Sequence, residues 1–161
     1  MFMTAEQAAM IISLLLVFLA AIQDRKNREV SNWFPIFLIV VFLISRIALV
    51  CFGKDNPIDS LLIPLAFSIA TLIVLLALTV TLERIKGKEM FGGGDIKIIA
   101  STTPILGIEG LLFALLVAFS AVLLCMFIKK NRFVSLDKDP TFPFVPFFAV
   151  GFAACTIISF L

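Results

Sequence analysis

The stretch Leu61–Leu82, with the sequence LLIPLAFSIATLIVLLALTVTL, runs without a single charged side chain. A helix needs about 20 mostly apolar residues to cross the hydrocarbon core of a bilayer, so this stretch is long enough to do so. The rest of the 161-residue chain has the same character, with 61% hydrophobic and 15% charged residues. Soluble domains usually carry about 25% charged residues. We therefore predict a single integral-membrane domain over residues 1–161.

The other apolar runs of the chain resemble this stretch, and we predict an all-α fold with six transmembrane helices. The predicted helices are Ala5–Ile22, Trp33–Phe52, Leu61–Leu82, Ile96–Ile108, Leu111–Ile128 and Phe142–Leu161. The fourth helix is short, and the alternative for it is a re-entrant segment that does not cross the bilayer.

The distribution of basic residues predicts the orientation. Most of the 13 basic residues lie in the first, third and fifth connections: Arg25, Lys26, Arg28, Arg84, Lys86, Lys88, Lys129, Lys130, Arg132 and Lys138. By the positive-inside rule, these connections face the cytoplasm and both termini face outside. A re-entrant fourth segment would place the basic fifth connection outside, so a full crossing is favoured. No basic tract is long enough to suggest a nucleic-acid partner.

The absence of histidine excludes several kinds of catalytic site. Without His, the chain has neither a Ser–His or Cys–His triad nor an HExxH zinc site. The three cysteines, Cys51, Cys125 and Cys155, are far apart and lie in or beside apolar runs. They form no Cys-x-x-Cys pair, so we expect small buried side chains and no metal or cofactor.

Two acidic residues differ from the others, which, like Glu6 and Asp59, are expected to be solvated at helix ends. Asp24 directly follows the first apolar run, and Asp95 directly precedes the fourth. The predicted topology puts both at the cytoplasmic edge of the membrane. Acidic side chains near the hydrocarbon boundary are costly unless they are paired or wet, so both are candidates for a functional site.

Three glycines precede the second of these acids, in the order Gly92, Gly93, Gly94 and Asp95. Glycines beside a catalytic acid would let an extended substrate backbone come close. The simpler interpretation is a glycine loop in which Asp95 is the N-cap of the fourth helix. The two interpretations are compatible.

Two neighbouring carboxylates suit hydrolysis. They cannot easily both ionise, so they share one proton and activate a water between them. The ionised member acts as general base while the protonated member polarises the scissile carbonyl. Such a pair titrates as a unit, so neither role is assigned to one residue.

Three segments carry a resemblance to a known family. They are DRKNREVSN at Asp24–Asn32, GGGDIK at Gly92–Lys97, and FPFVPF at Phe142–Phe147 followed by Gly151. In order and spacing the chain resembles the short-form type IV prepilin peptidases and their archaeal preflagellin relatives. Val30 and Ser31 stand where that family usually has Ile and Pro.

The resemblance implies that Asp24 and Asp95 are the catalytic pair of an aspartic endopeptidase. Its substrates would be pilin, pseudopilin or preflagellin precursors, cut after a short basic leader at the cytoplasmic face of a prokaryotic inner membrane. Larger bacterial members carry paired Cys-x-x-Cys motifs and also methylate the product, so this chain is expected to be a peptidase alone. Its partners would be the precursor and the lipid bilayer; the sequence gives no sign of an oligomer interface.

Other matched residues are expected to shape the site: Gly92, Gly93, Gly94, Lys97, Asn32, Pro143 and Pro146. Of these, Lys97 is expected to extend to the membrane interface rather than pair with Asp95. Asn32 is expected to cap the second helix, and the prolines to shape the entry to the last helix.

Two alternatives remain open at this stage. Presenilin-like proteases share the G-x-G-D pattern but are much longer and lack the Asp24 segment. A small transporter or structural membrane subunit could instead use Asp24 and Asp95 as an ion or proton site.

Overall fold

The computed structural model describes residues 5–27, 30–52, 56–86, 92–132 and 144–161, and all of the secondary structure in these ranges is helical. The elements are α1 (Ala5–Asn27), α2 (Trp33–Cys51), a π-helical turn η1 (Ile58–Leu62), α3 (Ile63–Lys86), α4 (Gly93–Arg132) and α5 (Val145–Phe160). The prediction of an all-α fold is confirmed.

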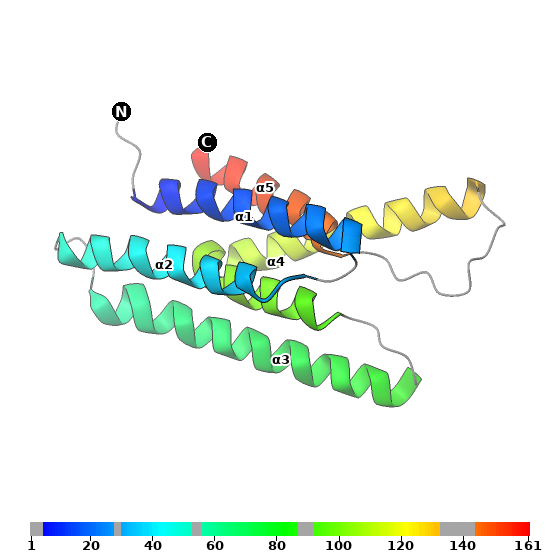
Figure 1. Cartoon of the computed structure of the whole chain (residues 1–161), viewed down its shortest axis with the longest axis horizontal. Helices are drawn as coiled ribbons and strands as arrows, with labels where there is room; N and C mark the ends of the chain where they lie inside the picture. The colour runs from blue at the N-terminus through cyan, green and yellow to red at the C-terminus, as the bar shows by residue number, and fades with distance from the viewer. Residues whose placement is uncertain (1–4, 28–29, 53–55, 87–91, 133–143) are drawn as a thin grey trace.

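Helix α4 is two helices joined at Gly107, where the backbone is not helical, with φ 69° and ψ 173°. This conformation is open to glycine and strongly disfavoured for other residues. Figure 1 shows that the chain reverses direction there, so that residues 93–106 and 108–132 run antiparallel. These halves correspond to the predicted fourth and fifth helices, but the first half begins at Gly93 rather than Ile96.

Consecutive helical segments run in opposite directions along the bundle (Figure 1). The ends of α1 and α3 and the starts of α2, α4 and α5 lie at one end of the bundle, which we call the aspartate end because Asp24 and Asp95 lie there. The start of α1, the end of α2, the turn η1 and the end of α5 lie at the other end. Helix α4 contacts α1, α2, α3 and α5, and α3 packs against α4 and η1.

The bundle has a small apolar core and a large apolar surface. Fully buried side chains include Phe42, Ile98 and Phe148, whereas α3 exposes residues such as Ile69 and Val74. Within the described ranges, four helical stretches are long and apolar enough to cross a membrane: Ala5–Asn27, Trp33–Cys51, Ile58–Ile85 and Gly93–Ile128, of which the last includes the reversal at Gly107. Helix α5 is apolar but shorter. A soluble protein rarely exposes so much contiguous apolar surface, so these helices indicate a membrane protein.

The cysteines are less buried than the sequence suggested. Cys51 is exposed at the end of α2, and Cys125 and Cys155 are partly buried. The prediction of three buried cysteines is therefore wrong, because the outer faces of these helices have no protein to pack against.

Helices α4 and α5 pack backbone to backbone. Gly110, Ala114 and Ala118 recur every fourth residue, and both alanines are fully buried. A Cβ added to Gly151 on α5 would lie 2.1 Å from the Ala114 carbonyl oxygen. Small residues at this spacing let two helices approach closely, and this packing explains the glycine that follows the FPFVPF segment.

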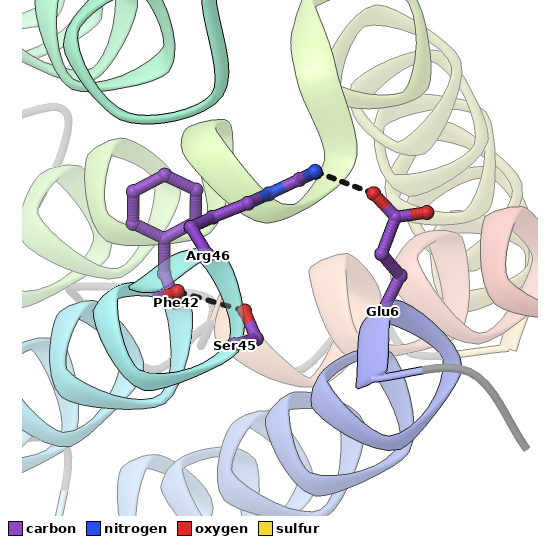
Figure 2. Close-up of polar contacts among 4 residues, drawn as sticks. All are labelled: Glu6, Phe42, Ser45 and Arg46. Atoms are coloured by element: carbon purple, nitrogen blue, oxygen red, sulfur yellow. Dashed lines mark hydrogen bonds and ion pairs between the residues drawn. The ribbon is translucent and has the colours of Figure 1, made fainter. Parts of the chain in front are cut away.

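Glu6 in the first turn of α1 and Arg46 near the end of α2 form an ion pair (Figure 2). Arg46 Nη1 pairs with Glu6 Oε1, and the Arg46 guanidinium lies 5.9 Å from the centre of the Phe42 ring. These residues and Ser45 line a cavity of about 50 Å³, large enough for water. Glu6, expected to be only solvated, is therefore also paired, which joins the start of α1 to the end of α2.

We predict that Gly151→Leu destabilises the protein by at least about 3 kcal/mol, because no rotamer relieves a clash with backbone. Thermal unfolding of the detergent-solubilised protein measures this. The matched control is Val150→Leu at the neighbouring position, whose side chain is exposed. Equal unfolding temperatures for the two variants would contradict the close packing.

Candidate active site

Asp24 faces the interior because α1 continues past the predicted end at Ile22 to Asn27. The buried residues of α1 recur at steps of three or four, which places them on one face of the helix: Ala9, Ser13, Val17, Ala20, Ala21 and Asp24. Asp24 is 6% exposed. It therefore lies on the last turns of a helix, turned inward by the helical period, and not in the connection that follows.

The Asp24 carboxylate meets the start of α5. It accepts a hydrogen bond from the backbone N–H of Val145, the first residue of that helix. The first N–H groups of a helix have no partner within it, and the helix dipole favours negative charge there. The second oxygen, Oδ2, is buried and accepts no hydrogen bond from the residues that the structure describes. It is available to a proton or a water.

Asp95 is the third residue of α4 and not its N-cap, so that prediction is wrong. The Gly92 carbonyl accepts hydrogen bonds from the N–H groups of Asp95 (3.0 Å) and Ile96 (3.4 Å), which makes Gly92 the capping residue. The Asp95 carboxylate in turn accepts a hydrogen bond from the backbone N–H of Gly92. This side-chain bond is the half of a capping box that the third helical residue makes, and it holds the Asp95 side chain against the start of its own helix.

The structure brings Asp24 and Asp95 together, because their carboxylates are close enough to interact electrostatically. Asp24 comes from the last turns of α1 and Asp95 from the first turn of α4. Two carboxyls that come within hydrogen-bonding distance of each other can bind one proton between them and activate a water.

The glycines before Asp95 have different surroundings. A Cβ on Gly92 would make ordinary contact with Asp95 Oδ2 at 3.4 Å, and a Cβ on Gly93 would meet nothing within 4 Å. A Cβ on Gly94 would lie 3.0 Å from the Cβ of Val30. Gly94 therefore allows the start of α4 to pack closely against the segment that leads into α2, whereas Gly93 has no such neighbour among the residues that the structure describes.

Lys97 and Asn32 contact each other. Lys97 Nζ donates a hydrogen bond of 2.8 Å to Asn32 Oδ1, and both residues are exposed. Asn32 makes no side-chain capping bond to α2, and its backbone is in the right-handed helical region. The prediction that Asn32 caps α2 is therefore wrong, because its side chain is used between two segments and not within one.

The remaining predicted residues are the two prolines. Pro143 lies outside the described residues. Pro146 is the second residue of α5, where proline is well tolerated because the first N–H groups are not bonded within the helix. The sequence did not point to the Val145 N–H as a site group. The only signal was Pro146, which marks the start of a helix but does not indicate which group accepts hydrogen bonds from the first N–H groups of that helix.

Among the described residues, no three His, Cys, Asp or Glu side chains gather where they could hold a metal ion. In comparisons with known proteins, the family model described as the type IV leader peptidase family matches residues 11–128. The match includes both aspartates and ends before α5. Searches of curated proteins and of solved structures give no match.

We predict that Gly94→Val destabilises the protein by about 1–3 kcal/mol, because the new side chain would collide with Val30. Gly93→Val is the matched control, since its side chain enters open space. Thermal unfolding in detergent compares the two, and adding Val30→Ala to Gly94→Val should restore part of the loss. Equal effects of the two glycine substitutions would argue against the contact.

Proposed function

This chain belongs to the type IV leader peptidase family, and we propose that it is a membrane-embedded aspartic endopeptidase that removes the basic leader of prepilin-like precursors. The observation that carries the proposal is the meeting of Asp24 and Asp95 at one end of the bundle. Both acids fall within the residues that match the family.

The proposed mechanism uses the carboxyl pair to activate water. The ionised carboxylate removes a proton from a water molecule, which attacks the scissile carbonyl carbon. The protonated carboxyl donates a hydrogen bond to the carbonyl oxygen, and a proton then passes to the leaving amine. Three observations support this scheme: the free Asp24 Oδ2, the Val145 N–H on Asp24 and the Gly92 N–H on Asp95.

The glycines offer a place for the substrate backbone. Gly92 and Gly93 are exposed beside Asp95, and a Cβ on Gly93 would meet no neighbour. Glycines at these positions carry no side chains of their own that would block an extended chain from approaching Asp95. The proposed substrate keeps its hydrophobic helix in the lipid while its basic leader reaches this end of the bundle from the water.

We further propose that six helical segments cross a prokaryotic inner membrane, with the aspartate end in the cytoplasm and both termini outside. The alternating directions of the segments and the reversal at Gly107 support this topology (Figure 1). Arg25, Lys26 and Arg84 lie at the aspartate end, as the positive-inside rule requires of a cytoplasmic face. Because the chain lacks paired cysteines, we propose peptidase activity without methylation.

The central prediction is that Asp24→Asn and Asp95→Asn each lower the cleavage rate by about 100-fold or more, since each substitution removes a group that transfers a proton. The assay is cleavage of a tagged prepilin in membranes that contain equal amounts of inserted enzyme. Asp59→Asn is the control, because Asp59 is exposed on η1 at the opposite end. Near-normal activity in either aspartate variant would refute the carboxyl pair. Failure of the wild type across several leader sequences would favour an ion-binding or structural role.

The topology predicts opposite labelling of the two ends of the bundle. In a Cys125→Ala, Cys155→Ala background, the exposed Cys51 should react with a membrane-impermeant maleimide in intact cells. With Cys51→Ala and Asn27→Cys added, labelling should occur only after the cells are permeabilised, because Asn27 is exposed at the aspartate end. The reverse pattern would place the aspartates outside.

A further inference from the structure

The segment Val30–Asn32 lies between the two aspartate-bearing helices and is bonded to both. On one side, the Ser31 backbone N–H donates to Gln23 Oε1 at 3.3 Å, and Gln23 immediately precedes Asp24. On the other side, Asn32 Oδ1 accepts the 2.8 Å bond from Lys97, two residues after Asp95. The segment thus links Gln23, which is next to Asp24, to Lys97, which is two residues from Asp95.

Asp95 is flanked by contacts with this segment. Before Asp95, Gly94 packs so closely against Val30 that a Cβ on the glycine would lie 3.0 Å from the valine Cβ. After Asp95, Lys97 bonds to Asn32. One contact on each side restrains the first turn of α4 relative to the segment in both position and rotation.

The chemistry of Asn32 and Lys97 fits a contact between segments. Asparagine at the position before a helix usually caps it with its side chain, which stabilises the helix by about 1 kcal/mol. Asn32 makes no such bond and accepts from Lys97 instead. A hydrogen bond from an ammonium group is stronger than one between neutral groups, so it can hold two exposed side chains together.

We propose that Lys97 and Asn32 are positioning residues which, with the Gln23–Ser31 bond, set the distance and orientation of Asp95 relative to Asp24. This inference rests on the proposed function, because it assigns the residues a role in the same reaction. Neither residue touches the substrate in this scheme. They act by holding the carboxyl pair in a geometry that allows proton transfer.

The test measures kcat and KM for prepilin cleavage in membranes with Asn32→Ala and Lys97→Met. A displacement of about 1 Å in an active site can cost about 100-fold, so each variant should lose roughly 10- to 100-fold in kcat with little change in KM. The double variant should lose no more than either single variant, because both remove one contact. Asn32→Asp, which keeps the acceptor oxygen, should retain activity, and so should Asn32→Asp combined with Lys97→Arg.

Two controls separate positioning from other roles. Arg84→Met removes an exposed cation from the same end of the bundle, so it should leave kcat unchanged. If Lys97 acted only through its charge, Asn32→Ala would also leave kcat unchanged, and the proposal would be wrong. Thermal unfolding of each variant in detergent tests for a purely structural role. If the variants that lose kcat also unfold at a clearly lower temperature than the wild type, the role is structural and the proposal is wrong.

The outcomes also distinguish this inference from the proposed function. If the wild type cleaves, the aspartate variants do not, and Asn32→Ala cleaves normally, the positioning role fails and the peptidase stands. If the wild type cleaves none of the leader-bearing substrates, both fail. Additive losses in the double variant would overturn the inference alone, because two independent effects would then be at work.

Discussion

The hydrogen bond from the Val145 N–H to the Asp24 carboxylate connects the first helix of the chain to the last. Asp24 is buried and needs donors, and the start of α5 has N–H groups without partners in their own helix. The N–H donor and the carboxylate acceptor thus satisfy each other's hydrogen bonding where both residues are buried. With α1 and α5 joined at this end, α4 lies beside both, and its first turn brings Asp95 to Asp24.

The close packing of α4 against α5 depends on small residues, and the path of α4 depends on one glycine. The contact of Gly151 with the Ala114 carbonyl sets the distance between the helices, and Gly107 lets α4 return through the bundle without a connecting loop. The first half of α4 then carries Asp95, and the second half packs on α5, whose Val145 N–H donates to Asp24. Helix α4 therefore provides Asp95 itself and also packs against the helix whose start contacts Asp24.

The sequence predicted the features that depend on composition and pattern. The apolar runs predicted the helices, and the predicted topology put Asp24 and Asp95 at a common end. The glycines were interpreted as room for a substrate backbone, whereas Gly94 packs against Val30. It did not predict features that depend on a partner elsewhere in the chain. The α1 boundary was placed too early because residues 23–27 are polar, yet Asp24 completes an inward-facing stripe. Asn32 has a strong capping preference that the contact with Lys97 overrides, and a backbone group such as the Val145 N–H leaves no signature in the sequence.

The ion pair of Glu6 and Arg46 places charged groups at the end of the bundle opposite Asp24. Glu6 and Asp24 are 18 positions apart on α1, which corresponds to about 27 Å at 1.5 Å per residue. This length is close to the roughly 30 Å hydrocarbon thickness of a bilayer. In a membrane, the charged groups at the far end would resist being drawn into the lipid, so the depth of the aspartates below the headgroups follows from bilayer thickness and helix tilt. In the proposed topology, lipid chain length would thereby affect the proposed cleavage, because it would decide whether the two carboxyls meet water or hydrocarbon.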